Sequence, residues 1–132
     1  MKDSGAKKKN ISQAFGVTSS PTTSSTLFVP LPDMNVVHAN NTGKIRVSYS
    51  VVIDAGANNN PTTQIYIDGL PVGVTKNVTG VTGVSGGWTI SDAFVVNVSA
   101  GTHKIDIYWK NPSGATMTAY NTQRNLLVEE IQ

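Results

Sequence analysis

The chain of 132 residues contains no cysteine, so disulfide cross-links and thiolate metal sites are excluded. Charged residues make up only 14% of it. No stretch approaches the roughly 20 apolar residues that a membrane-spanning helix needs. The polar segment 1–10 resembles neither a signal peptide nor a membrane anchor. We therefore expect stability to come from packing or oligomerisation, in a protein that has no membrane partner.

The sequence also lacks a basic face. Four of its ten basic residues lie within the first nine positions, and the rest of the chain is slightly acidic. These four are Lys2, Lys7, Lys8 and Lys9. Proteins that bind nucleic acids usually spread basic residues over a folded face, with aromatic residues between them. We therefore predict no nucleic-acid partner.

The residues in excess are glycine, threonine, serine, valine and asparagine, with 12 glycines in all. Residues branched at Cβ fit a pleated sheet, while glycine, asparagine and serine suit tight turns. This composition predicts short strands joined by turns and no long helices. The chain length fits one domain with one core.

We predict two parts, an extended N-terminal arm over residues 1–26 and a β-domain over residues 27–132. The arm combines the lysines with a run rich in serine and threonine, and its main apolar anchors are Ile11, Phe15 and Val17. Such a segment is expected to become ordered only where it docks on another surface.

Alternating apolar residues are clearest between positions 45 and 53, which predicts a half-buried strand. Its apolar members are Ile45, Val47, Tyr49, Val51 and Ile53. Asp68 and Gly69 tolerate positive φ angles, so they predict a hairpin turn. Residues 73–87 predict a loop or a weak edge strand, and a break is expected near Ser91 and Asp92. Further strands follow, about eight in all, which predicts an all-β, two-sheet antiparallel jelly-roll sandwich.

No pattern of residues predicts catalysis. A catalytic triad would need a histidine with an orienting carboxylate, and the only histidines are His38 and His103. His103 follows a Gly-Thr turn at the start of a predicted strand, which favours a structural role, and His38 is no stronger a candidate. The aspartates are scattered over different strands and turns, so no metal site is predicted, although the loop after Asp54 leaves calcium open. We expect no cofactor and no enzymatic activity.

Sugar binding is a second possibility, because carbohydrate platforms place exposed aromatic rings beside polar loops. Tyr66, Tyr120 and Trp88 are the available rings. The candidate loop asparagines are Asn58, Asn59 and Asn60. The alternative to a sugar-binding role is that Trp88 and Trp109 belong to the hydrophobic core.

A second apolar set is expected on the outer faces of the sheets. If the alternating aliphatic residues point inward, their neighbours point outward. The outward set is Tyr66, Tyr108, Tyr120, Leu127 and Val52. Aromatic and aliphatic residues on outer faces are typical of subunit interfaces, so we predict that this set contributes to a homotrimer.

The order of several segments resembles that of a known family. The segments are 44–53, 65–69, 88–90, 100–109, 113–116 and 124–130, of which 100–109 and the ending from Arg124 are the most specific. They resemble the small jelly-roll domains of bacteriophage virion proteins, which share the fold of the tumour necrosis factor and complement globular-head trimers.

This resemblance implies a trimeric virion protein, on the phage head as a capsid decoration or head-fibre protein, or at the tail tip. We favour the head, with the arm docking on the major capsid protein or another virion protein after assembly in the host cytoplasm. The docking residues would be Lys7, Lys8, Lys9, Ile11 and Phe15. The alternative is a receptor-binding tail tip or a carbohydrate-binding module that recognises a host surface glycan.

Overall fold

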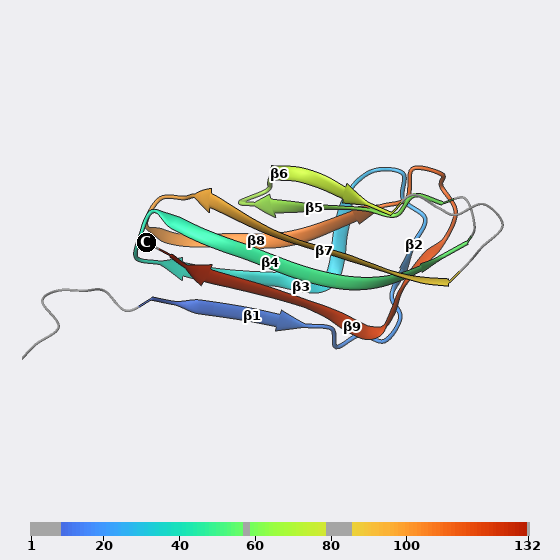
Figure 1. Cartoon of the computed structure of the whole chain (residues 1–132), viewed down its shortest axis with the longest axis horizontal. Coiled ribbons are helices and arrows are strands. Elements are labelled where there is room, and N and C mark those ends of the chain that lie inside the picture. Colours follow the sequence, from blue (N-terminus) through green and yellow to red (C-terminus); the bar gives the residue numbers. More distant parts are fainter. Residues whose placement is uncertain (1–8, 57–58, 79–85, 132) are drawn as a thin grey trace, which may run out of the picture.

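The computed structural model describes residues 9–56, 59–78 and 86–131, and all of its regular elements are β-strands. They form two antiparallel sheets that pack face to face (Figure 1). Among these residues there is no helix that could cross a membrane. The predicted all-β, two-sheet sandwich is confirmed.

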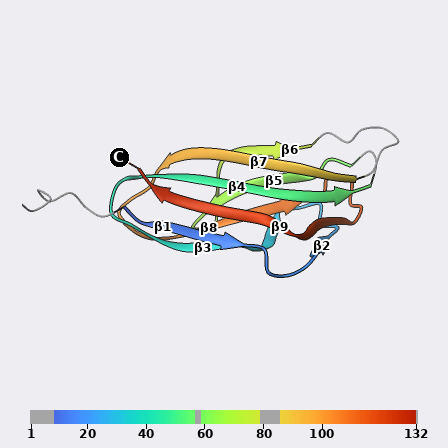
Figure 2. The ribbon, with the colours of Figure 1, turned by 60° about the horizontal axis from the view of Figure 1, so that its bottom comes forward.

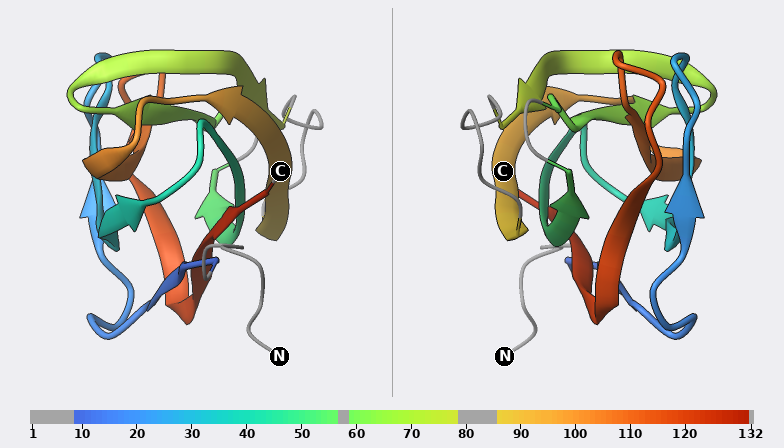
Figure 3. Two further views of the ribbon diagram at one scale, coloured as in Figure 1. Left: turned by 90° about the vertical axis from the view of Figure 1, so that its left-hand side faces the viewer. Right: turned by 90° about the vertical axis from the view of Figure 1, so that its right-hand side faces the viewer.

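Nine strands are described. They are β1 (Ile11–Phe15), β2 (Thr22–Thr23), β3 (Val29–Asn40), β4 (Lys44–Ala55), β5 (Thr62–Ile67), β6 (Leu70–Asn77), β7 (Gly86–Asn97), β8 (Gly101–Lys110) and β9 (Met117–Glu130). Sheet A has the order β1-β9-β4-β7, with β2 also paired to β9, and sheet B has the order β3-β8-β5-β6. Figure 3 shows the sandwich along its strands, with the two sheets curving around a common core.

The core follows from the strict alternation of β4. Ile45, Val47, Val51 and Ile53 are completely buried between the sheets. Tyr49, in the same row, spans both layers, and its hydroxyl forms a hydrogen bond of 2.7 Å with Thr63 Oγ1 on β5. Burial raises the pKa of Tyr49 to about 12.

The hairpin prediction is confirmed, because Asp68 and Gly69 join β5 to β6 with φ angles of 52° and 83°. The predicted break near Ser91 and Asp92 is wrong. Strand β7 pairs with β4 without interruption, and Asp92 on its inner side forms an ion pair of 3.8 Å with Lys76 of β6. A polar residue therefore occupies an inward position without ending the strand. Part of the predicted loop, residues 79–85, lies outside the described residues.

The described part of the N-terminal arm lies against the sandwich itself (Figure 2). Strand β1 pairs with β9 as the edge of sheet A, with Phe15 opposite Asn125. Beyond it, Gly16 fits closely against β9, where an added Cβ would lie 2.6 Å from the carbonyl oxygen of Thr122. This segment is thus extended, and its position is fixed by hydrogen bonds to the C-terminal strand.

The buried guanidinium of Arg124 anchors this segment. It donates to the carbonyl oxygens of Pro32 (2.9 Å), Asn121 (3.1 Å) and Thr18 (2.8 Å), and to Asp33 Oδ2 at 2.7 Å. The same carboxylate accepts the backbone N–H groups of Thr18 and Val17, which lower the pKa of Asp33. One buried cation therefore joins three separate segments of the chain.

Candidate interaction surface

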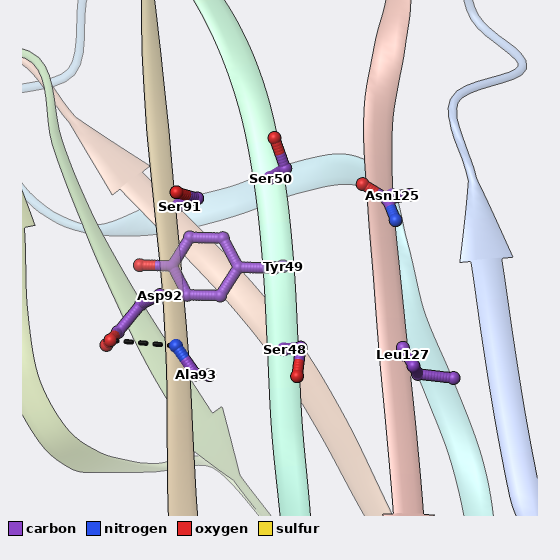
Figure 4. A pocket seen from close by; sticks show the side chains of 8 residues that line it. All are labelled: Ser48, Tyr49, Ser50, Ser91, Asp92, Ala93, Asn125 and Leu127. Atoms are coloured by element: carbon purple, nitrogen blue, oxygen red, sulfur yellow. Dashed lines mark hydrogen bonds between the residues drawn. The ribbon is translucent and has the colours of Figure 1, made fainter.

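The outer face of sheet A is hollowed at its centre (Figure 4). The hollow has a volume of about 550 Å³ and opens to solvent. Its lining residues are Ser48, Tyr49, Ser50, Ser91, Asp92, Ala93, Asn125 and Leu127. Tyr49 and Asp92 belong to the inward rows of their strands. The lining side chains that point outward are therefore mostly small.

The strand register explains the hollow. Ser48 of β4 lies between Leu127 of β9 and Ala93 of β7, and Ser50 lies between Asn125 and Ser91 in the next row. Strands β4 and β7 thus present small side chains at the same height, beside Asn125 and Leu127 of β9. A sheet face with this pattern leaves room for side chains of another surface.

Large apolar residues border this hollow on both sides. Ile11 and Phe15 on β1 are 62% and 59% exposed, and Val95 on β7 is 45% exposed. The charged pair Arg46 and Glu129 lies 3.5 Å apart on the same face and balances its own charge. Exposed apolar side chains beside a shallow hollow are typical of surfaces that contact another protein.

The structure divides the predicted interface residues between two opposite faces. Val52 and Leu127 lie on the outer face of sheet A, whereas Tyr66 and Tyr108 lie on the outer face of sheet B. Tyr120 is 49% exposed, in a stretch of β9 that is irregularly paired with β4. The five residues therefore do not form one continuous patch.

On sheet B the aromatic residues pack on each other. The rings of Tyr66 and Tyr108 stack at 3.9 Å, and Phe28 meets Tyr66 edge-on at 6.1 Å. Lys110 Nζ lies 4.5 Å from the centroid of the Phe28 ring. Each of these three aromatic rings uses one face or edge in these contacts. Less ring surface therefore remains for stacking on a sugar.

Two of the predicted docking residues, Ile11 and Phe15, lie beside the hollow of sheet A and not on a separate arm. Ile11 and Phe15 project from β1 onto the outer face of sheet A, in the rows of Glu129 and Asn125. Lys9 is exposed, while Lys7 and Lys8 lie outside the described residues. Ile11, Phe15, Val52 and Leu127 thus share one face, although the sequence assigned them to two different contacts.

The candidate ligand loop is only partly available to a ligand. Asn59 is 7% exposed, and its Nδ2 donates to the carbonyl oxygen of Gly56 at 2.7 Å. Asn60 is exposed, and Asn58 lies outside the described residues. Trp88 is half-buried on β7 opposite Ile53. Asn59 therefore holds the loop together instead of facing solvent.

His103 has a carboxylate partner in the folded chain. Its Nδ1 lies 2.6 Å from Asp68 Oδ2, and its Nε2 lies 3.3 Å from Ser99 Oγ. The order Ser, His and Asp matches that of a hydrolytic triad. Nε2, however, is closer to the carbonyl oxygen of Ser99, at 2.8 Å, to which it donates.

In this arrangement a protonated His103 bridges the turn at Asp68 and the turn at Ser99. The hydrogen bonds to Asp68 and to the Ser99 carbonyl raise the pKa of His103, and the bond from His103 lowers the pKa of Asp68. An imidazolium that donates from both nitrogens cannot take a proton from Ser99. In the residues that the structure describes, no three histidine, cysteine or acidic side chains gather as metal ligands.

We predict that His103→Gln reduces stability most near pH 5. Because the pKa of His103 is raised, its contribution is complete below the unfolded value of about 6.5 and disappears as the pH rises through the folded value. Because the pKa of Asp68 is lowered, its contribution is present above about 3.9 and disappears in acid. Urea unfolding from pH 4 to 9 would measure this, with a maximal loss of about 1 kcal/mol for a surface pair. A loss that is equal at pH 5 and pH 9 would contradict the prediction.

Comparisons with known proteins identify the fold. No protein-family model matches the chain, and no curated protein matches it significantly. Among solved structures, the VP2 subviral particle of infectious bursal disease virus matches over 92% of this chain with a TM-score of 0.60 and 12% identity. The fold is a jelly-roll-like sandwich.

Two further matches support the same fold. The Gt strain of infectious bursal disease virus matches with a TM-score of 0.59 and 13% identity over 92% of this chain. The CBM36-1 domain of a multidomain xylanase from the hindgut metagenome of Trinervitermes trinervoides matches with a TM-score of 0.50 and 13% identity. It covers 93% of this chain and 98% of that domain, whereas this chain spans only about a third of the viral proteins, at 32% and 33%.

Proposed function

We propose that this chain is a structural protein of a virus particle, which works through contacts between protein surfaces. The observation that carries this proposal is the match of 92% of the chain to a viral particle protein. The exposed apolar border of the hollow on sheet A supports it, because such a surface is costly to leave in water.

The more specific form of this proposal is a phage capsid decoration or head-fibre protein that forms a homotrimer. The outer face of sheet A offers Ile11, Phe15, Val52 and Leu127 for contacts within the assembly. The basic segment with Lys7, Lys8 and Lys9 would attach the assembly to an acidic surface of the particle, through attraction that salt weakens.

The structural role is tested on particles purified by density gradient from the source that encodes the sequence. We expect peptides of this chain in those particles at a fixed ratio to the major capsid protein. Absence from intact particles would contradict the proposal. A ratio that falls after washing with high salt would support attachment through the basic segment.

The homotrimer is tested by light scattering on the full chain and on a variant that begins at Lys9. The truncation stops there because β1 belongs to sheet A, and a longer deletion would expose the edge of β9. We expect three times the chain mass for both proteins. A monomer at concentrations up to about 100 µM would contradict the trimer, since homotrimers with large apolar contacts stay associated at such concentrations.

Carbohydrate binding is the second candidate. It is favoured by the match to the CBM36-1 domain, which covers almost all of both chains. The partly exposed Trp88 and Tyr120 are the residues available to stack on a sugar. Binding to a glycan array that is lost in Trp88→Ala or Tyr120→Ala would support this function in place of the first.

A further inference from the structure

Three buried side-chain atoms in the described part of the chain have no hydrogen-bond partner. They are His38 Nε2, Asn40 Oδ1 and Glu130 Oε2. Their residues are 0%, 4% and 3% exposed. A buried polar atom without a partner costs on the order of 1–3 kcal/mol, so each of the three calls for an explanation such as a bound ion or water.

In each of the three side chains, a hydrogen bond holds the other polar atom. Nδ1 of His38 lies 2.8 Å from Ser12 Oγ, and Nδ2 of Asn40 donates to the carbonyl oxygen of Thr42. Oε1 of Glu130 accepts the backbone N–H groups of Asn10 and Asn41 at 3.3 and 2.9 Å. Anchoring one atom while leaving the other free is the pattern by which proteins orient metal ligands.

Hydrogen bonds place these side chains in one neighbourhood. Glu130 is bonded to the backbone of Asn41, which directly follows Asn40. Asn10, bonded to the same carboxylate oxygen, also donates through Nδ2 to the carbonyl oxygen of Ala39, between His38 and Asn40. His38 contacts Ser12, two residues after Asn10 on the same segment. The site thus lies where β1, the end of β3 and the end of β9 meet.

The charge of the site calls for a cation. Glu130 is almost fully buried, and among the described residues no lysine or arginine forms an ion pair with it. His38 is completely buried, and its Nε2 has no hydrogen-bond partner. A buried carboxylate without a positive partner is costly, and an imidazole nitrogen without a hydrogen-bond partner can offer its lone pair to a metal.

We propose that His38 Nε2, Asn40 Oδ1 and Glu130 Oε2 bind a divalent metal ion of the Zn²⁺ type. One nitrogen and two oxygen ligands leave a fourth tetrahedral position for water. A Ca²⁺ ion is a poorer fit, because it takes six to eight oxygen ligands and not an imidazole nitrogen. The metal would join β1 to the rest of the sandwich, and this inference is independent of the proposed function.

The test is refolding of the full chain from urea, either with a slight excess of ZnCl₂ or with EDTA. After desalting, elemental analysis measures the zinc retained. We expect about one zinc ion per chain for the natural sequence, and a higher melting temperature for the zinc-refolded protein than for the EDTA-refolded one. Glu130→Gln, which keeps the acceptor for Asn10 and Asn41 but removes the charge, should retain less than a tenth of that zinc.

Matched variants distinguish zinc held at the buried site from zinc held elsewhere on the chain. His103→Gln removes the other histidine and should retain zinc as the natural chain does. Ser12→Ala keeps all three ligands but removes the anchor of His38, and should weaken zinc binding by about 10- to 100-fold. It serves as the second variant if Glu130→Gln does not fold. A natural chain that retains no zinc, zinc that is lost in His103→Gln, or a crystal structure with only a water between the three atoms would overturn the proposal.

Discussion

Replacing Arg124 with alanine should lower the free energy of unfolding by about 3–5 kcal/mol, the usual cost of removing one partner from a buried ion pair. The guanidinium is completely buried, and its partner Asp33 is about three quarters buried. Without it, the carbonyl oxygens of Pro32 and Thr18 lose their donor as well. A single domain is stable by only about 5–15 kcal/mol, so this one change is a large part of the total.

Urea denaturation of the purified variant measures this loss, followed by fluorescence of the buried Trp109. The matched control is Arg46→Ala, because Arg46 also forms an ion pair but is half exposed. That change should cost less than about 1 kcal/mol. Arg124→Lys should remain well below the natural stability, because one ammonium cannot reach the four acceptors that the planar group serves. Equal losses for Arg124→Ala and Arg46→Ala would show that the buried guanidinium is not the anchor of this segment.

Ala93→Arg should weaken self-association by more than tenfold. Ala93 lies beside Ser48 in the hollow of sheet A, and a long cationic side chain there would fill the space that a partner needs. An interface that closes over this residue would also have to bury an unpaired charge. Sedimentation over a range of concentrations measures the change, with circular dichroism as a check on folding.

Val37→Arg is the control for this experiment. Val37 is 68% exposed on the outer face of sheet B, so the same substitution is placed on the opposite side of the sandwich. It should leave self-association unchanged. If Val37→Arg disrupts the assembly and Ala93→Arg does not, the contact uses sheet B and the stacked pair Tyr66 and Tyr108.

Local patterns in the sequence predicted the features that depend on neighbouring residues. The period of two between Ile45 and Ile53 predicted the central strand, and the turn chemistry of Asp68 and Gly69 predicted the hairpin. These features are predictable because backbone geometry alone decides them. The alternation also indicated which residues point outward, but it could not assign them to one sheet or the other.

The remaining features depend on residues far apart in the chain. The partner of Arg124 is 91 positions away, and the partner of His103 is 35 positions away. We predicted a break in the strand near Asp92, because no neighbouring residue in the sequence indicates that Lys76 lies beside its carboxylate. The buried group around His38 was missed for the same reason, since Glu130 is distant in sequence and only the folded sheets bring it to the end of β3.

The pairing of β1 with β9 also brings the start of β1 next to the end of β9. The backbone N–H of Glu130 donates to the carbonyl oxygen of Asn10 at 3.1 Å, so the first and last strands leave the sandwich at the same end (Figure 1). A domain with adjacent ends can be inserted into a surface loop of another protein without separating the ends of that loop. The same geometry allows a short linker to join the end of β9 to the start of β1, with new ends opened elsewhere, so this fold is suited to circular permutation.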